Sequence, residues 1–311
     1  MNGGNYGGGN FGGGFGRGGD DRGGNNPRWS RRPESRAGAR KVETTDGAVV
    51  ELDAELRGVA ALKHDKMRER ESQYTVEGVR AVETILQNAR ENVVAVYEVE
   101  GVQWKRELLG AGRDRTPLRT ITEDQMAALS HTKTSQGLLA VAAARALRVN
   151  WDTARRVTLV DGVQDPGNLG GIFRTSAAFG FDALILGKGT VDAWNPRVAR
   201  GSAGLVASVP FESGHNLSSM LEFLRSKGFV VVGTSPHGKE TIESLAHKLN
   251  ARPGHIEGKV AFLIGNEGRG TEQNLLDQCD LKLRISMADE VESLNVAVAH
   301  GILCSRFSAL A

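Results

Sequence analysis

Apolar and polar residues recur along the first half of the chain in a pattern of short strands and amphipathic helices. The stretch YTVEGVRAVETILQNA (74–89) predicts a short strand, a turn at its glycine and a helix with one apolar face. The β-branched run VVAVYEV (93–99) is typical of a buried strand. Thr122 and Gln125 match a capping box that predicts a helix start, and GLLAVAAA (137–144) predicts another strand. The region therefore has the pattern of a small α/β domain.

Two further segments flank this region. Apolar residues at near-helical spacing among many charges predict one helix from about Leu52 to Glu71. The polar, arginine-containing stretch RALRVNWDTARR (145–156) favours a linker to a second domain. We therefore predict four parts, which are a tail at 1–40, a small domain at 41–145, a linker at 146–155 and a second domain at 156–311.

The second half begins with the order strand, turn, helix. VTLVDGV (157–163) predicts a strand, QDPGNLG (164–170) a glycine-rich turn and IFRTSAAFG (172–180) a helix. That order puts the N–H groups of the turn at the carboxyl edge of a parallel sheet, where α/β proteins bind ligands. The expected fold class is α/β, a parallel sheet with crossover helices. Other predicted elements are strands at 183–187, 205–211, 229–235 and 260–265 and a helix at 216–228.

Bulk composition changes this picture little. With 311 residues and 40% hydrophobic content, the chain can bury the cores of two ordinary domains. There is no apolar run long enough to span a membrane and no recognisable secretory leader, so we expect a cytoplasmic protein with no membrane partner. Cys279 and Cys304 lack the spacing of a disulfide framework or a zinc site, so we predict small buried cysteines and no metal.

Charge is distributed unevenly. Residues 1–40 hold seven of the 39 Lys and Arg residues and three of the 37 Asp and Glu residues, which leaves +4 in this tail and −2 in the remainder. The tail also contains 14 glycines and only isolated aromatics, so it cannot bury enough apolar surface to fold and is predicted to be disordered. Arginine among glycine and aromatic residues suits loose contact with RNA, and a flexible solubilising extension explains the same composition.

Three glycine-rich stretches raise the question of a nucleotide site. GVQDPGNLGG (162–171) lacks the ordered glycines of a dinucleotide-binding loop. GTSPHGKE (233–240) matches a phosphate-binding loop except that Glu240 stands where Ser or Thr would hold Mg²⁺, which argues against a nucleotide-hydrolysing enzyme. GNEGRG (265–270) follows a predicted strand directly, and its glycines can take φ > 0 and admit a ligand without a Cβ clash.

Three segments taken together point to a family. DPGNLGGIFRTSAAFG (165–180), FLIGNEGRG (262–270) and ISMADEVESLNVAVAHGI (285–302) resemble, in order and spacing, the signature motifs of the SpoU/TrmH RNA 2′-O-ribose methyltransferases of the SPOUT superfamily. The intermediate stretch NPRVARGSAG (195–204) is similar to the family's segment between the first and second motifs. One departure is Ser286, where many members have proline, and it removes no chemical group.

The first half takes part in the same resemblance. YTVEGVRAVETIL (74–86) and TKTSQGLLAVA (132–142) are similar to the family's N-terminal substrate-binding domain, so the resemblance covers about residues 50–308 and leaves out the tail. It implies a small α/β domain of the ribosomal-protein-like sort. Such a domain would select RNA by shape and unpaired bases, because the grooves of A-form RNA hide their sequence.

The resemblance also implies how the second domain is built. In the family, the C-terminal segment threads through a loop to make a deep trefoil knot, an exception to the rule against knots, and two knotted domains form a homodimer. Backbone groups of the second and third motifs surround the cofactor, S-adenosyl-L-methionine. The cofactor-binding residues that this implies are Thr234, Gly265, Asn266, Gly268, Gly270, Ile285 and Leu294.

Catalytic residues follow from the same motifs. Methyl transfer from a sulfonium is an in-line displacement that needs a positioned ribose hydroxyl and removal of its proton, and it requires no metal. Asn168 and Arg174 match family positions that orient and activate the target nucleotide. Glu267, Ser293 and Asn295 match its polar positions around the cofactor and the catalytic arginine. Without the motifs, Asn168 would be a turn residue and Arg174 a surface arginine in an ion pair.

Arginine is a poor general base. Lowering the pKa of a guanidinium from about 12.5 to near 7 takes about 5.5 units, or roughly 7.5 kcal/mol, which few sites supply. We therefore expect Arg174 to grip the phosphate of the target nucleotide and to stabilise the developing alkoxide. The proton then leaves to the phosphate or to water.

Candidate RNA contacts are Arg197 and Arg200 in the intermediate stretch, and Lys133 and Gln136 before a strand of the small domain. The small domain and the tail favour ribosomal RNA of the 23S type over tRNA as the substrate. A non-catalytic RNA-binding or ribosome-assembly protein that keeps the fold is the alternative, and the intact catalytic set argues against it.

Overall fold

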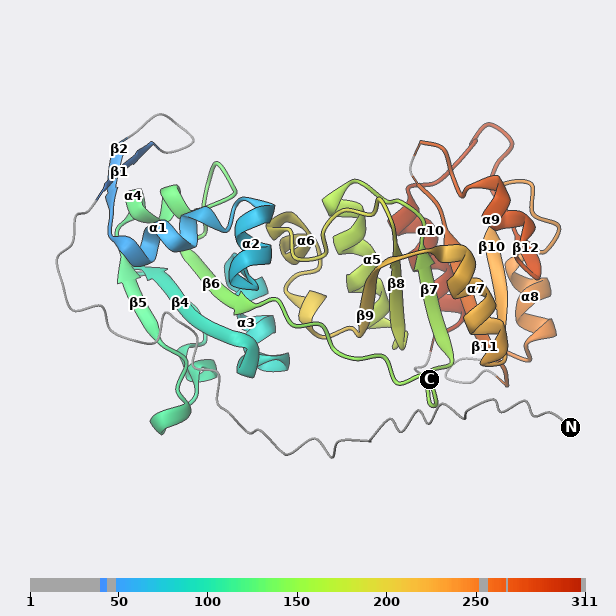
Figure 1. Cartoon of the computed structure of the whole chain (residues 1–311), viewed down its shortest axis with the longest axis horizontal. Helices are drawn as coiled ribbons and strands as arrows, with labels where there is room; N and C mark the ends of the chain where they lie inside the picture. The colour runs from blue at the N-terminus through green and yellow to red at the C-terminus, as the bar shows by residue number, and fades with distance from the viewer. Residues whose placement is uncertain (1–39, 44–48, 252–256, 267, 309–311) are drawn as a thin grey trace, which may run out of the picture. The chain divides into compact units, whose positions relative to one another are not determined.

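Figure 1 shows the fold of the protein in a computed structural model. The structure describes residues 40–43, 49–251, 257–266 and 268–308. All of them belong to one compact unit, Arg36–Ala311. Of the predicted disordered tail, residues 1–39 lie outside the described residues, and Arg40 begins a strand, so the predicted boundary is one residue too late. The predicted catalytic Glu267 also lies outside the described residues. No helix in the described part of the chain is long and apolar enough to cross a membrane.

The first half is built on a four-stranded sheet. Its elements are β1 (Arg40–Glu43), β2 (Val49–Leu52), α1 (Ala54–Ala61), α2 (Asp65–Glu71), β3 (Gln73–Glu77), α3 (Val79–Asn88), η1 (Arg90–Asn92), β4 (Val93–Val99), η2 (Arg106–Leu109), η3 (Gly112–Asp114), β5 (Leu118–Ile121), α4 (Glu123–Leu129) and β6 (Leu138–Ala143). The strand order is β3-β6-β4-β5, with β3 and β4 antiparallel to β6 and β5 parallel to β4. The predicted strands and the capping box of Thr122 and Gln125 are confirmed.

The helical segment predicted from about Leu52 to Glu71 is confirmed in part, because it forms two helices and its first residue belongs to a strand. Leu52 ends β2, where it pairs with Arg40 of β1. Helix α1 starts after Asp53, whose carboxylate accepts a hydrogen bond of 3.0 Å from the backbone N–H of Leu56. A turn at 62–64 then separates α1 from α2. The charged pattern has helical spacing in both parts, but the aspartate cap and the strand pairing decide where helix can begin.

The second half is built on a six-stranded sheet, in which every pairing is parallel as predicted. Its elements are β7 (Arg156–Val160), α5 (Pro166–Ala178), β8 (Ala183–Gly187), α6 (Pro196–Gly201), η4 (Leu205–Ala207), β9 (Phe211–His215), α7 (Leu217–Ser226), β10 (Phe229–Thr234), α8 (Ile242–Lys248), β11 (Lys259–Ile264), α9 (Gln273–Asp277), β12 (Leu281–Leu283) and α10 (Val296–Arg306). The strand order is β12-β10-β11-β7-β8-β9. The chain direction across the sheet reverses at β7 and β11, and ligands of open α/β sheets bind beside such a point.

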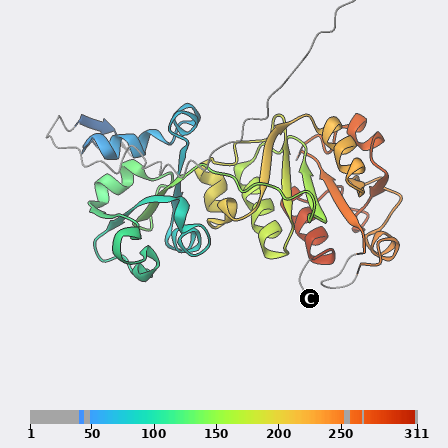
Figure 2. The ribbon, with the colours of Figure 1, turned by 60° about the horizontal axis from the view of Figure 1, so that its bottom comes forward.

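Helices cover both faces of this sheet (Figure 2). Helices α5 and α10 pack against each other, and their buried Phe173 and Leu303 belong to one apolar cluster. Helix α7 packs against β10, and its buried Leu221 and Leu224 belong to a second cluster. The strands contribute alternating residues to the two clusters, as expected for a sheet that is buried on both sides.

Two predicted boundaries in this half are wrong. Helix α5 begins at Pro166 rather than at residue 172, because Asp165 caps it by accepting a hydrogen bond of 2.9 Å from the N–H of Asn168. Asn168 therefore lies in the first helical turn. The apolar run at 205–211 is a 3-10 turn followed by the start of β9, rather than a strand. Its residue Val206 is buried in an apolar cluster that both sheets share.

The two halves of the chain are in direct contact. The buried Arg68 of α2 forms an ion pair of 2.7 Å with Asp192, which precedes α6. The ring of Tyr74 on β3 lies 4.8 Å from that of Trp194. Gly204 takes a φ of +85°, and a Cβ there would lie 2.3 Å from the carbonyl oxygen of Ala81. The small sheet is therefore packed against the α6 and η4 side of the large one.

Candidate active site

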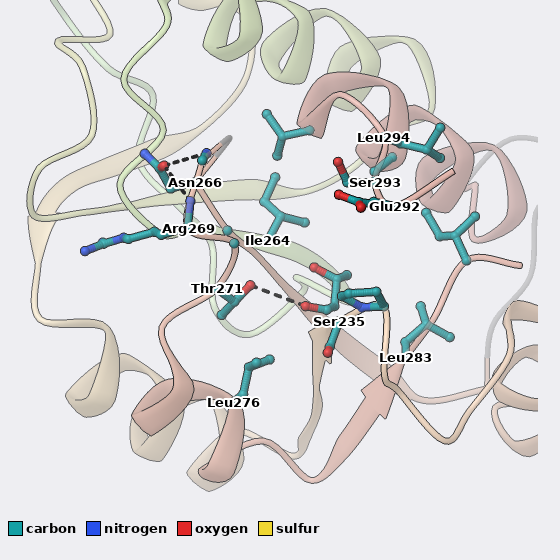
Figure 3. Close-up of a pocket in the computed structure, with 18 of the residues that line it drawn as sticks. Ser235, Ile264, Asn266, Arg269, Thr271, Leu276, Leu283, Glu292, Ser293 and Leu294 are labelled. Atoms are coloured by element: carbon teal, nitrogen blue, oxygen red, sulfur yellow. Dashed lines mark hydrogen bonds between the residues drawn. The ribbon is translucent and has the colours of Figure 1, made fainter. Parts of the chain in front are cut away.

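A pocket of about 480 Å³ lies at the carboxyl ends of β10, β11 and β12, and we call it the motif pocket (Figure 3). The segments that follow these strands line it together with the start of α10. Ile264 and Leu283 contribute apolar walls, and Ser235, Thr271 and Ser293 contribute hydroxyl groups. The position is the one expected for a ligand of a parallel α/β sheet.

All the residues that the sequence predicted to bind the cofactor line the motif pocket, and these are Thr234, Gly265, Asn266, Gly268, Gly270, Ile285 and Leu294. The predicted catalytic Ser293 lines it as well. The structure thus brings these residues together, while their chemical roles stay predictions. Two charged lining residues, Arg269 and Glu292, were missed. Arg269 lies inside the glycine-rich motif, so its charge was a signal that could have been used.

The loop after β11 has a tight shape that glycine permits. Asn266 and Gly270 exchange two backbone hydrogen bonds of 3.0 Å, and the side-chain amide of Asn266 donates to the carbonyl oxygen of Gly162 at 2.6 Å. A Cβ on Gly265 would lie 2.0 Å from the nitrogen of Thr271. Of the three glycines predicted to take φ > 0, only Gly270 does, at +69°. Gly265 is required for a different reason, which is the close approach of its own loop.

Asp161 connects this loop to the end of β7. Its carboxylate is buried, accepts a hydrogen bond of 3.0 Å from the backbone N–H of Glu272 and lies 3.3 Å from the guanidinium of Arg269. Because β7 continues towards α5, the carboxylate joins the second motif to the first.

The first and third motifs meet through two asparagines. The side-chain amide of Asn295 donates a hydrogen bond of 2.8 Å to the amide oxygen of Asn168. Asn295 also caps α10, since its side-chain oxygen accepts from the N–H groups of Ala297 and Val298. Its chain neighbours Leu294 and Val296 line the motif pocket. The predicted catalytic pair Asn168 and Asn295 is therefore in contact beside that pocket.

Under these motifs lies a buried histidine. The ring nitrogens of His300 are 2.7 Å from the hydroxyl of Thr175 on α5 and 3.1 Å from the hydroxyl of Thr158 on β7. The thiol of Cys304 is 3.2 Å from Nε2. Burial lowers the pKa of His300 to about 3, so the ring is neutral and links β7, α5 and α10.

Arg174 lies on the other side of α5 from this core, in what we call the basic cavity. It comprises two adjoining cavities of about 690 and 280 Å³, and Thr132, Arg174 and Arg200 line both. Among the predicted RNA contacts, Lys133, Arg197 and Arg200 line the larger part, and Gln136 and Arg200 line the smaller. Residues that sequence reasoning missed here are Arg80 and His131.

Arg174 itself is exposed. Within the described residues it forms no ion pair, so the simple interpretation of a surface arginine paired with a carboxylate does not hold there. Burial, together with the positive charges of Lys63, Arg68 and Arg200 and against the opposing charge of Glu77, lowers the pKa of His131 to about 4.

Several backbone amides of the loop at 233–240 are already used within the protein. The N–H of Ser235 donates to the oxygen of Leu283 at 2.9 Å, and that of Glu240 donates to Lys282 at 3.0 Å. A Cβ on Gly238 would lie 2.4 Å from the carbonyl carbon of Leu283. The glycine therefore serves packing against β12, in agreement with the prediction that this loop is not a nucleotide-hydrolysing site.

Neither cysteine has the environment of a reactive thiol. Cys304 is buried, and Cys279 is only partly buried, which corrects the prediction for the latter. Burial raises the pKa of Cys279 to about 11 and raises that of Cys304 as well. In the described part of the chain no cluster of three or more His, Cys, Asp or Glu side chains is arranged to hold a metal ion.

Known proteins resemble this chain over both halves. Residues 155–305 match the SpoU rRNA Methylase family, and residues 53–140 match the MRM3-like substrate binding domain. The 23S rRNA (guanosine(2553)-2′-O)-methyltransferase RlmP of Bacillus subtilis is 37% identical over 183 residues, which are 59% of this chain and 69% of that protein. The chain belongs to the SpoU rRNA methylase family. The family predicted from the three motifs is thereby confirmed.

Three further similarities extend over most of this SpoU-family chain. The 23S rRNA (guanosine-2′-O-)-methyltransferase RlmB of Bordetella pertussis is 30% identical, over 72% of this chain and 92% of that protein. A TrmH-family protein from Porphyromonas gingivalis has a solved structure that is 28% identical, with a TM-score of 0.67, and the match covers 83% of this chain and 99% of that one. The SpoU methyltransferase AviRb from Streptomyces viridochromogenes, solved in complex with the cofactor AdoMet, shares the fold at 24% identity and a TM-score of 0.67, over 82% and 97% of the two chains.

Proposed function

We propose that this protein transfers the methyl group of S-adenosyl-L-methionine to a ribose 2′-OH in ribosomal RNA of the 23S type. The observation that carries the proposal is the meeting of the three motifs at one place. The Asn168–Asn295 hydrogen bond joins the first and third motifs beside a pocket that the second and third motifs line. Relatives named as 23S rRNA 2′-O-methyltransferases support the substrate class.

The motif pocket suits S-adenosyl-L-methionine in size and chemistry. Its volume of about 480 Å³ lies in the range of small-molecule sites. Ile264, Leu283 and Leu294 offer an apolar wall to the adenine. Arg269 and Glu292 carry the charges that complement the carboxylate and the ammonium of the methionine part. The absence of a Cβ at Gly265 keeps the loop closed on itself and leaves its backbone to face the ligand.

S-adenosyl-L-methionine supplies an activated methyl group when it is bound. Asn168 and Asn295 hold each other in place at 2.8 Å and orient the target ribose towards the motif pocket. Ser293, whose hydroxyl lines the pocket, is a further hydrogen-bonding group for the target or the cofactor. Glu267 keeps the role implied by the family, as a polar partner near the cofactor.

Arg174 binds the phosphate of the target nucleotide in this proposal. Its guanidinium has no ion-pair partner within the described residues and lines the basic cavity. A bidentate contact with phosphate would hold the ribose in line and stabilise negative charge that develops on the 2′-oxygen. The proton leaves to that phosphate or to water, since a guanidinium is a poor base.

The small sheet acts as the substrate-binding domain and the tail adds loose contacts to RNA. The match of residues 53–140 to a substrate binding domain supports the first part of this proposal. Arginine-rich, glycine-rich composition supports the second. A substrate in ribosomal RNA places the proposed activity in the cytoplasm.

The second domain is proposed to be knotted and to form a homodimer. Strand β12 lies at the edge of the sheet, yet the chain after it returns to the middle, where α10 packs on α5 and His300 contacts Thr158 of β7. Such a return supports a threaded C-terminal segment. Helix α10 also leaves Val298 52% and Ile302 36% exposed one helical turn apart, an apolar strip that a second copy would cover.

The experiment that tests the function is methyl transfer from radiolabelled S-adenosyl-L-methionine to total rRNA and, separately, to total tRNA. We expect label on a ribose 2′-oxygen of large-subunit rRNA, located by nuclease mapping. Label on tRNA alone would overturn the substrate class. Measured cofactor binding with no label on either RNA would instead support a non-catalytic RNA-binding protein.

A further inference from the structure

The first half of the chain contributes charged residues to the basic cavity, which Arg174 also lines. Arg80 is exposed on α3, and Lys133 is exposed in the loop between α4 and β6. Arg80 lines the smaller part of the basic cavity and Lys133 the larger part, and Arg174 lines both. With Arg197 and Arg200 of α6, five cations from both halves of the chain line these two adjoining cavities.

These cations are not neutralised by neighbours. None of the five forms an ion pair within the described residues. The acidic lining residues are Asp165, which caps α5, and Glu77. The larger cavity also receives Pro166 and Gly167, at the N-terminus of the 13-residue helix α5, where the helix dipole favours an anion.

Glu77 forms no ion pair with any of the five cations, and its carboxylate oxygens are bound by one loop. It is 4% exposed, and it accepts hydrogen bonds from the hydroxyls of Ser130 and Thr132 and, at 2.9 Å, from the backbone N–H of His131. The hydroxyl of Thr132 is at 2.8 Å. The carboxylate therefore fixes the start of the loop that carries Lys133.

The other end of this loop is fixed as well. The side-chain oxygen of Gln136 accepts a hydrogen bond of 2.9 Å from the N–H of Val79, the first residue of α3, and Arg80 follows directly. His131 contacts the hydroxyl of Thr75 on β3 at 2.9 Å. The loop and the start of α3 thus form one rigid wall of the basic cavity, formed before any ligand binds.

We propose that the basic cavity binds the phosphate backbone of the RNA strand that carries the target nucleotide, and that Arg80 and Lys133 of the small sheet supply part of this site within the same chain. This inference rests on the proposed function for the identity of the polyanion. It adds Arg80 as an RNA-binding residue and makes Glu77 a positioning residue that holds the loop of Lys133. The first half of the chain then positions the RNA backbone phosphates relative to the methyl-transfer site.

The test measures RNA affinity of the full chain against salt concentration, with a short, fluorescently labelled single-stranded RNA of mixed sequence. We expect Arg80→Ala and Lys133→Ala each to weaken binding roughly 5-fold near about 150 mM KCl and to reduce the slope of log K against log[KCl] by about 0.7, the value for one lost phosphate contact to single-stranded RNA. Arg113→Ala is the matched control, because Arg113 is an exposed arginine of the same half that lines neither part of the basic cavity.

Unchanged slopes in both variants would overturn the proposal, as would an equal change in Arg113→Ala. Displacement of the RNA by poly-glutamate at equal charge concentration would also overturn it in favour of an acidic protein partner. Glu77→Gln tests the positioning role, since it keeps the size but presents an NH₂ group to donors; we expect a raised KM for RNA with cofactor affinity unchanged, and lowered cofactor affinity as well would indicate general unfolding.

The methyl-transfer assay and the salt dependence of RNA binding together separate this inference from the proposed function. If the wild type transfers methyl groups but the salt slope is the same in Arg80→Ala and Lys133→Ala, the proposed function stands and the proposed phosphate site is refuted. If both substitutions reduce the salt slope of RNA binding but the wild type methylates no RNA, the phosphate site stands and the proposed function is refuted.

Discussion

The motif pocket is lined by apolar side chains, hydroxyl groups and a glycine-rich loop, whereas the basic cavity is lined by five cationic side chains from α3, α5, α6 and the loop at 130–136. In the first, a single added methyl group meets backbone atoms that cannot rotate away. In the second, each cation contributes one part of a shared field that salt screens. Shape should therefore decide binding in the motif pocket, and charge should decide it gradually in the basic cavity.

The sharpest way to break this contrast is Gly265→Ala. Its Cβ would lie 2.0 Å from the nitrogen of Thr271 and 2.2 Å from the carbonyl carbon of Gly270, so the loop must open. We expect at least about a 1000-fold loss of affinity for S-adenosyl-L-methionine, measured by calorimetry, because the overlap involves backbone. In the control Gly258→Ala, the Cβ meets nothing closer than 3.9 Å, and affinity should not change. Normal cofactor binding by Gly265→Ala would refute recognition by shape.

Arg174→Ala tests whether the two regions can be separated. The guanidinium lines the basic cavity and not the motif pocket. We expect a loss of about 100-fold to 1000-fold in kcat for methyl transfer, the effect of removing one preorganised charge that stabilises a transition state. Cofactor affinity, measured in the same preparation, should stay within about 2-fold. A comparable loss of cofactor binding would mean that the two sites are not independent.

The buried His300, which links β7, α5 and α10, gives a third prediction. Burial lowers the pKa of His300 to about 3 from an ordinary value of 6.5, so the folded protein keeps this ring neutral while the unfolded chain takes up a proton below pH 6.5. Stability therefore falls as the pH falls from about 6.5 towards 3, by about 2 kcal/mol at pH 5 for this group.

Urea unfolding at pH 7.5 and at pH 5 measures this loss. His131, whose pKa is lowered to about 4, also makes the folded protein less stable as the pH falls. His300→Gln lowers stability at neutral pH, since it disturbs the contacts with Thr158 and Thr175, but it should flatten the decline between the two pH values. An equally steep decline in His300→Gln would show that other groups cause it.

The smallest expected effect concerns Gln136, a predicted RNA contact that carries no charge. Its side-chain oxygen already accepts from the N–H of Val79 and so caps α3. We expect Gln136→Ala to lower the free energy of unfolding by about 1 kcal/mol, as for loss of a helix cap, and to leave the salt dependence of RNA binding unchanged. A changed salt slope would mean that the position of the loop, and not only the presence of the cations, determines how many phosphates the basic cavity contacts.

The sequence by itself determined the local elements and the chemistry. Short apolar runs located most strands, the capping box at Thr122 located a helix start, and the three motifs identified the family and many of the residues that line the motif pocket. Such signals work because they depend on residues close together in the chain, through the spacing of apolar positions and the short-range hydrogen bonds of a helix cap. They failed where a distant contact decided, as at 52–71 and at 205–211.

Only the tertiary structure decided which of these residues meet. Asn168 and Asn295 are 127 positions apart in the chain, yet their amides are hydrogen-bonded. Arg80 and Lys133 came to line one cavity with Arg174 because Arg68 pairs with Asp192 and the small sheet packs on α6. Periodicity describes the faces of single elements, and packing between elements depends on the shape and charge of surfaces that no short stretch of sequence contains.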